Sequence, residues 1–309
     1  MVIVVLAGGV GAARFLEGLV HVIPQEQITI IGNVGDDADI HGLHVSPDLD
    51  IVTYTISGLV DPVKGWGLRG DTFECQNGLR KYGYRTWFNL GDRDLATHIY
   101  RTQELRNGRK LSEITEDLTR RLGIRTRIIP ATDDHFQTHV LTKKGWMHFQ
   151  EYMVKLKTRP RVYRVSFRGA RTARPAKQVI ESIMKASGII VAPSNPVVSI
   201  GAILSVPGIR SALRRTKRTV VGISPIIGGK TVKGPADKLM KACGIRPSAV
   251  GVANSYRDFL DALILDRVDQ KLTTDIEQLG VRPVVTNTLM KTLNDKIRLA
   301  RVALGELEQ

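Results

Sequence analysis

The first sixteen residues, MVIVVLAGGVGAARFL, constrain the fold of this chain more than any other stretch. Residues 2–6 form an apolar, β-branched run that is too short for a helix. Glycines follow at positions 8, 9 and 11, and a helix-forming run extends over 12–19. This order predicts a strand, a tight turn and a helix. Glycine permits positive φ and a close approach of backbone N–H groups to a ligand, and the positive end of the helix dipole lies at the same point.

The ligand that such a turn favours is a phosphate group. The glycine spacing differs from the G-x-G-x-x-G of dinucleotide dehydrogenases, and no Lys-Ser/Thr pair follows as in a Walker loop. The phosphate therefore need not belong to NAD or ATP. The alternative is a glycine-rich turn that serves only the packing of the strand against the helix.

The composition is that of a globular protein with a substantial core. The chain has 309 residues, of which 42% are hydrophobic. No apolar run approaches the ~18 residues of a membrane span, and residues 2–6 are too short for a signal sequence. We therefore expect a cytoplasmic protein without a membrane partner. Cys75 and Cys243 lie far apart and lack neighbours at ligand spacing, which argues against a disulfide framework and a zinc site.

The net charge of +15 calls for an anionic partner. Basic residues cluster over 159–177 and 210–218, but only 6% of the residues are aromatic and no nucleic-acid-binding signature is present. A phosphorylated small substrate accounts for the charge as well as RNA or DNA does. We predict no nucleic-acid partner and keep an RNA-binding or nucleotide-sensing protein as the minority alternative.

Strand and helix patterns alternate through most of the chain. After the first unit we expect strands at 27–32, 85–88, 188–192, 219–223, 249–253 and 281–285, with a closing helix over 289–307. Right-handed crossovers between such units give an α/β fold with a Rossmann-like, doubly wound parallel sheet. Alternating patterns over 127–174 predict a smaller, antiparallel α+β insertion. The core would then comprise 1–126 and 175–309, in one compact unit with the insertion.

Polar turns follow several of the expected strands. In a parallel sheet the carboxyl ends of the strands share one edge, so the turns at 8–12, 33–37, 89–92, 193–196 and 224–230 are predicted to surround one crevice. Two of these turns open helices and contain small residues, which suits phosphate. Ser194 and Asn195 could donate hydrogen bonds from side chains as well as from the backbone.

Carboxylates are concentrated near the N-terminus of this basic protein, at Asp36, Asp37, Asp39, Asp48, Asp50 and Asp61. Oxygen ligands without a nearby cysteine suit Mg²⁺, which prefers one or two carboxylates plus substrate phosphates. Magnesium-dependent phosphoryl chemistry is the resulting hypothesis. The alternative is that Asp36 and Asp37 form turns and that Asp48 caps a helix beginning there. We favour the cap for Asp48 and a functional role for Asp50 and Asp61.

Seven ordered blocks of sequence resemble the 2-phospho-L-lactate transferase family, whose members act in the biosynthesis of the deazaflavin coenzyme F-420. The resemblance extends from the N-terminus to about residue 240 and, more loosely, to the end. The blocks are GGVGAARFL at 8–16, NVGDDADIHGLHVSPDLD at 33–50, DPVKGWGLRGDT at 61–72, WFNLGDRDLATHIYRTQ at 87–103, PATDDHFQTHV at 130–140, PSNPVVSIGAIL at 193–204 and GISPIIGGKTVKGPA at 222–236.

The resemblance implies a Mg²⁺-dependent transfer of 2-phospholactate from lactyl-2-diphospho-5′-guanosine to the deazaflavin alcohol 7,8-didemethyl-8-hydroxy-5-deazariboflavin (Fo). GMP is released and coenzyme F-420-0 is formed. By motif, Asp50 and Asp61 are expected metal ligands, Asp50 and Asn89 are expected to contact Fo, and Asp50 is the expected catalytic residue, holding the ion or accepting the hydroxyl proton. The expected nucleotide-binding residues are Gly8, Gly9, Gly11, Ala12, Asn33, Ser194 and Asn195.

Other questions stay open at this point. The flat deazaflavin ring needs an apolar slot, for which Trp66, Trp87 and Phe88 are candidates, although each could equally belong to the core. A sugar-nucleotide-type enzyme or binding protein of the same fold that uses a uridine substrate is the rival within the same class. The residues that would recognise guanine and the three-carbon acid of the donor are not specified, and a homodimer is expected.

Overall fold

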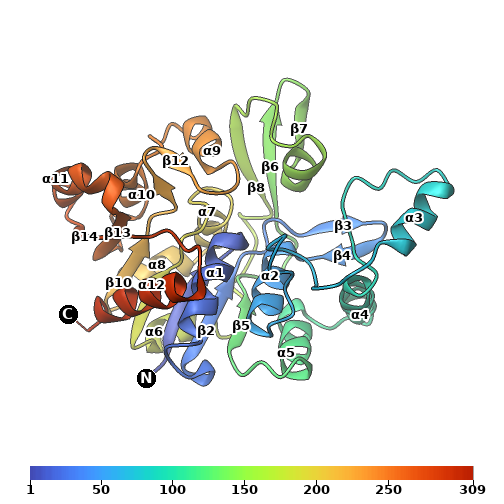
Figure 1. The fold of residues 1–309 in the computed structure, drawn as a ribbon, viewed down its shortest axis with the longest axis horizontal. Helices are drawn as coiled ribbons and strands as arrows, with labels where there is room; N and C mark the ends of the chain where they lie inside the picture. Colours follow the sequence, from blue (N-terminus) through green and yellow to red (C-terminus); the bar gives the residue numbers. More distant parts are fainter. Residues whose placement is uncertain (309) are drawn as a thin grey trace.

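The computed structural model describes residues 1–308 and contains a central sheet of seven parallel strands (Figure 1). Their order across the sheet is β14-β13-β10-β9-β1-β2-β5. This arrangement confirms the predicted Rossmann-like, doubly wound α/β fold. The strands are β1 (Ile3–Ala7), β2 (Ile28–Gly32), β5 (Arg127–Pro130), β9 (Gly188–Val191), β10 (Val220–Ile223), β13 (Ala262–Asp266) and β14 (Arg282–Thr286).

The central strands are apolar along their whole length because helices cover both faces of the sheet. Every residue of β1 is buried, and Leu6 is in register with Ile31 of β2 on one side and Val191 of β9 on the other. Helix α1 (Gly9–Leu19) packs between α2 (Pro47–Ile56) and α12 (Leu293–Gly305). The remaining helices are α3 (Glu74–Lys81), α4 (Asp94–Arg106), α5 (Leu111–Arg121), α6 (Val179–Lys185), α7 (Ile200–Ser205), α8 (Ile209–Arg215), α9 (Ala236–Ala242), α10 (Ala249–Tyr256) and α11 (Thr273–Glu277).

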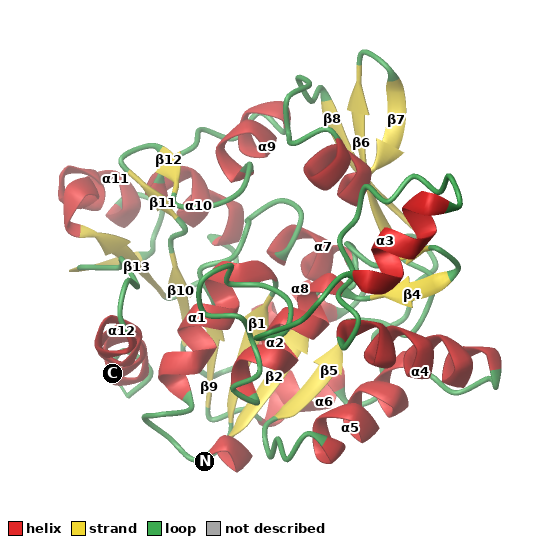
Figure 2. Cartoon of the chain, turned by 45° about the vertical axis from the view of Figure 1, so that its right-hand side comes forward, coloured by secondary structure: helices red, strands yellow, loops and turns green. Residues whose placement is uncertain are grey.

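The predicted antiparallel insertion is present as a three-stranded sheet beside the main one (Figures 1 and 2). Its order is β7 (Gly145–His148), β6 (Gln137–Thr142) and β8 (Arg164–Arg168). The predicted boundary at residue 127 is wrong, because β5 pairs in parallel with β2 and buries Ile128 and Ile129 in the main sheet. Phe149 of the insertion belongs to the same hydrophobic core as the main sheet, so the two parts form one compact unit.

Two expected strands are absent from the described residues. Residues 85–88 form no strand, because Trp87 and Phe88 instead pack onto a small apolar cluster beneath the hairpin of β3 (Ala38–Ile40) and β4 (Leu43–Val45). Residues 249–253 belong to helix α10, whose start is capped by the Ser248 side chain accepting a hydrogen bond from the N–H of Gly251 at 3.1 Å. The strand between β10 and β14 is formed by a later apolar run, β13.

Helix starts also differ from the sequence prediction near the site. Helix α2 begins at Pro47 with Ser46 in the cap position, so Asp48 lies within the first turn and is not the cap. Helix α3 begins after Phe73. The Asp71 carboxylate accepts hydrogen bonds from the backbone at the start of α4. No helix among residues 1–308 is long and apolar enough to cross a membrane.

Candidate functional site

The turns that follow β1 and β9 meet at the point where the strand order reverses. From β1 the chain runs outward to β2 and β5, whereas from β9 it runs the other way to β10, β13 and β14. The N–H of Gly8 donates to Ser194 Oγ at 3.2 Å, and a Cβ atom on Gly11 would lie 2.2 Å from the carbonyl oxygen of Pro193. Such a switch point is where open parallel sheets bind ligands.

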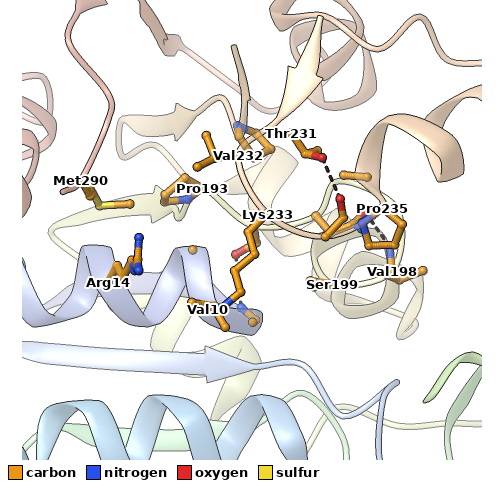
Figure 3. A pocket seen from close by; sticks show the side chains of 18 of the residues that line it. Val10, Arg14, Pro193, Val198, Ser199, Thr231, Val232, Lys233, Pro235 and Met290 are labelled. Carbon is orange, nitrogen blue, oxygen red and sulfur yellow. Dashed lines mark hydrogen bonds between the residues drawn. The ribbon is translucent and has the colours of Figure 1, made fainter. Parts of the chain in front are cut away.

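A cavity of about 280 Å³ opens at this switch point (Figure 3). Its wall includes five of the residues predicted to bind a nucleotide, namely Gly8, Gly9, Gly11, Ser194 and Asn195. Ala12 and Asn33 are fully buried and lie outside the lining. Of the five turns predicted to converge, four contribute to the cavity lining, namely 8–12, 33–37, 193–196 and 224–230, whereas 89–92 does not. The space is large enough for part of a nucleotide.

A carboxylate of the protein itself, that of Asp48, lies at the N-terminus of α1. The Asp48 carboxylate accepts a hydrogen bond from Asn33 Nδ2 at 2.8 Å, and the backbone N–H of Gly9 acts to lower the pKa of Asp48. A Cβ atom on Gly8 would lie 2.5 Å from Asp48 Oδ2, so glycine is needed there for this close approach. The N–H of Gly8 is satisfied by Ser194 Oγ, and the Asp48 carboxylate faces the N–H of Gly9. These two glycines shape the cavity, and a ligand phosphate needs further donors.

Asp36 and Asp48 are buried acids in the cavity wall. Burial raises the pKa of Asp48 to about 6, although the hydrogen bond from Asn33 opposes this shift. Burial and the nearby charge of Asp48 also raise the pKa of Asp36 well above its ordinary value. Within residues 1–308, Asp36 Oδ1 has no hydrogen-bond partner. The pair therefore presents unsatisfied carboxylate oxygen that a proton or a cation would stabilise.

Asp50 points away from the cavity. Residues two apart on a helix face directions about 200° apart, so Asp48 faces α1 whereas Asp50 faces α4. Asp50 forms a buried ion pair with Arg101, in which Nη1 lies 3.1 Å from Oδ2 and Nη2 contacts Oδ1. Burial alone would lower the pKa of Arg101, but the charge of Asp50 raises it. His98 Nδ1 lies 3.8 Å from Asp50 Oδ2, so Asp50, Arg101 and His98 form one buried polar cluster between the two helices.

Asp61 and Asn89 also lie outside the cavity lining. Asp61 begins a tight loop in which its Oδ1 accepts the N–H groups of Val63 and Lys64, at 2.9 and 3.0 Å. Those hydrogen bonds, first that of Lys64, lower the pKa of Asp61. Asn89 is exposed, next to the apolar cluster that contains Phe88. The expected roles of Asp50, Asp61 and Asn89 in binding Fo and the metal stay predictions.

Comparison with known protein families decides to which family this chain belongs. The family described as 2-phospho-L-lactate transferase CofD matches residues 3–302. The chain belongs to this family. Membership in the 2-phospho-L-lactate transferase CofD family confirms the resemblance seen in the sequence blocks and supports transferase activity in coenzyme F-420 biosynthesis.

Relatives within the family carry two different names. A phosphoenolpyruvate transferase of Streptomyces griseus is 44% identical over 315 residues, covering 100% of this chain and 99% of the relative. A 2-phospho-L-lactate transferase of Methanosarcina acetivorans is 40% identical over 302 residues, covering 98% of each. A solved structure from Bacillus halodurans aligns with a TM-score of 0.65 at 18% identity over 98% of each chain, which shows the fold alone.

Two basic residues of the cavity wall were not singled out from the sequence, and the role of a third wall residue was assigned differently. Arg14 stands inside the block GGVGAARFL, Lys233 inside GISPIIGGKTVKGPA, and Asp48 was interpreted as a cap. A helical side chain leans toward the helix N-terminus, so an arginine five residues after Gly9 could have been placed near the glycine turn. No sequence signal places Lys233, because its loop meets α1 only through the tertiary fold.

Proposed function

We propose that this chain transfers the 2-phospholactate group from lactyl-2-diphospho-5′-guanosine to Fo, releasing GMP and forming coenzyme F-420-0. The observation that carries the proposal is the cavity at the β1–β9 switch point, in a chain whose family match spans residues 3–302. The cavity is formed by the glycine turn and the Ser194 turn, both of which belong to the blocks that resemble the family.

The proposed reaction is an in-line displacement at phosphorus. The terminal hydroxyl oxygen of Fo forms a bond to the phosphorus that carries the lactyl group. The bond from that phosphorus to the bridging oxygen breaks, and GMP departs with the electron pair. Such a reaction depends on positioning and on neutralising charge at the phosphoryl oxygens. Asp50, the catalytic residue predicted from the sequence, is the proposed acceptor of the hydroxyl proton. It faces α4 and contacts Arg101 through both oxygens, so it would have to give up part of that contact and turn toward the cavity.

Mg²⁺ is part of the same proposal. Asp36 and Asp48 fit a divalent cation, because both are carboxylates in the cavity wall and Asp36 Oδ1 is buried without a hydrogen-bond partner in the described chain. Asp50 and Asp61, the ligands predicted from the sequence, offer the same oxygen chemistry, but Arg101 engages both oxygens of Asp50. A bound ion would neutralise charge on the phosphoryl oxygens.

The deazaflavin ring of the acceptor is proposed to lie on the side of α2 that carries Asp50, with its ribityl chain extending to the donor in the cavity. Trp87 and Phe88 lie immediately before Asn89 and form an edge-to-face pair with ring centroids 5.7 Å apart. Both rings are partly buried against the cluster under β3 and β4. They offer an apolar surface of the kind that a flat deazaflavin ring requires. A homodimer and a cytoplasmic location stay predictions from the sequence.

The test is release of GMP. Incubation of the protein with Fo, Mg²⁺ and lactyl-2-diphospho-5′-guanosine is expected to release GMP in proportion to F-420-0. Omission of Fo or chelation of Mg²⁺ should stop the release. Parallel reactions should contain the phosphoenolpyruvate-bearing guanosine donor, because relatives carry both names, and a uridine-linked donor. Absence of GMP with both guanosine donors would refute the proposal, and turnover of the uridine donor alone would favour the rival function.

A further inference from the structure

Two basic side chains from distant parts of the chain converge at the cavity. Arg14 extends from α1, and Lys233 extends from the loop between β12 (Lys230–Thr231) and α9 toward Val10 of α1 (Figure 3). The Lys233 Nζ and Arg14 Nη2 atoms lie 3.7 and 3.9 Å from the position that a Cβ atom would occupy at Gly65. Both cationic groups therefore point to one small region at the cavity wall.

Neither cation has an acidic partner among residues 1–308. Arg210 and Arg214, in contrast, are two neighbouring cations that share the carboxylate of Asp258. No such ion pair involves Arg14 or Lys233, and the Lys233 ammonium donates only to the carbonyl oxygen of Lys64, at 3.4 Å. Partial burial and the charge of Arg14 lower the pKa of Lys233. Two neighbouring cations without a counter-ion repel each other, and an anion between them would remove the repulsion.

An anionic ligand needs positive charge in this cavity, because two carboxylates already lie in its wall. Asp48 occupies the start of α1, and Asp36 adds a second buried carboxylate to the wall. A diphosphate entering this space meets negative charge at the helix terminus that would otherwise attract it. The cations of Arg14 and Lys233 stand on the same wall and supply the compensating positive charge. Arginine and lysine are the usual side chains that bind phosphate oxygens.

We propose that Arg14 and Lys233 together bind the diphosphate of the nucleotide donor, with residues 61–67 folded over them. This inference rests on the proposed function, because it names residues that hold that donor. Gly65 has φ of +67° and lies directly against both cationic groups, and Lys64 receives the Lys233 hydrogen bond. The loop that contains Asp61 is thereby joined to the cavity wall through Lys233.

The experiment compares Arg14→Gln and Lys233→Gln with a matched control, Lys241→Gln. Lys241 is an exposed lysine of α9 outside the cavity lining, so its replacement removes the same charge elsewhere. Affinities for guanosine, GMP, GDP and inorganic pyrophosphate are measured by calorimetry. Each cavity variant is expected to bind GDP and pyrophosphate at least about tenfold more weakly than the control, with guanosine unchanged, since charge-assisted hydrogen bonds to phosphate are lost. Arg14→Lys should restore part of the loss.

Two results would overturn the inference. One is GDP and pyrophosphate affinity in both cavity variants equal to that of the control. The other is an equal loss for guanosine and GDP, which indicates general damage to the cavity. Failure of the proposed function gives a different pattern, in which the wild type releases no GMP from the donor while pyrophosphate binding still depends on Arg14 and Lys233.

Discussion

The Gly11→Ala variant is expected to lose about 3 kcal/mol of unfolding free energy, at the upper end of the usual cost of overpacking. The added Cβ atom would lie 2.2 Å from the carbonyl oxygen of Pro193. Neither side can move easily, because Gly11 is in the first turns of α1 and Pro193 is joined to the buried strand β9 through the buried residue Ala192. Forcing these turns apart would also break the Gly8 to Ser194 hydrogen bond. Urea unfolding measures the stability, and calorimetry with GDP measures the accompanying loss of nucleotide binding.

Gly78→Ala is the matched control. Gly78 also lies within a helix, α3, but a Cβ atom there would meet nothing within 4 Å. This variant should gain roughly 0.5–1 kcal/mol, because alanine loses less backbone entropy than glycine when a helix forms. Equal stability changes for the two variants would show that α1 and the Pro193 turn are not in close contact.

The second large effect concerns the buried ion pair between Asp50 and Arg101. Arg101→Met is expected to cost about 3–5 kcal/mol, because it leaves the Asp50 carboxylate buried without its counter-ion. Arg101 is 2% exposed and both of its terminal nitrogens contact Asp50. Asp50→Asn should be destabilising for the same reason, so its loss of turnover alone would not demonstrate catalysis.

A double variant separates structure from catalysis. Asp50→Asn combined with Arg101→Gln replaces the ion pair with two neutral amides that can hydrogen-bond to each other, so stability should be partly restored. If Asp50 also accepts the hydroxyl proton or holds the ion, turnover stays near zero in the double variant. Recovery of turnover together with stability would assign Asp50 a structural role only. Unchanged stability in both single variants would contradict the buried pair itself.

The sequence was sufficient for the fold and for the place of the cavity. The strand, glycine turn and helix of residues 1–19 and the turn at Pro193 and Ser194 are local patterns, and parallel sheet geometry brings the strand ends to one edge. The predicted strand at 249–253 failed because a short apolar run is equally suited to a buried helix, and the Ser248 cap decides the outcome. The prediction of a strand at 85–88 failed because Trp87 and Phe88 pack onto the β3–β4 hairpin, which follows β2 in the chain.

The directions of the acidic side chains could not be predicted in the same way. Asp48 and Asp50 are two residues apart, and only the start of α2 at Pro47 determines which of them faces α1 and which faces α4. A sequence interpretation that began the helix at Asp48 assigned it to capping. Arg101 and Lys233 come from segments 51 and 185 residues away from these acids, respectively, so no local pattern reveals the pairing of Arg101 or the approach of Lys233 to the cavity.

The most direct measurement is a crystal structure of the protein with GDP bound. We predict that the diphosphate lies in the cavity between the Gly8 turn and Ser194, within hydrogen-bond distance of Arg14 and Lys233. GDP bound instead at another surface, such as the basic depression around Arg214 and Lys217, with the cavity at the β1–β9 switch point left empty, would contradict the account.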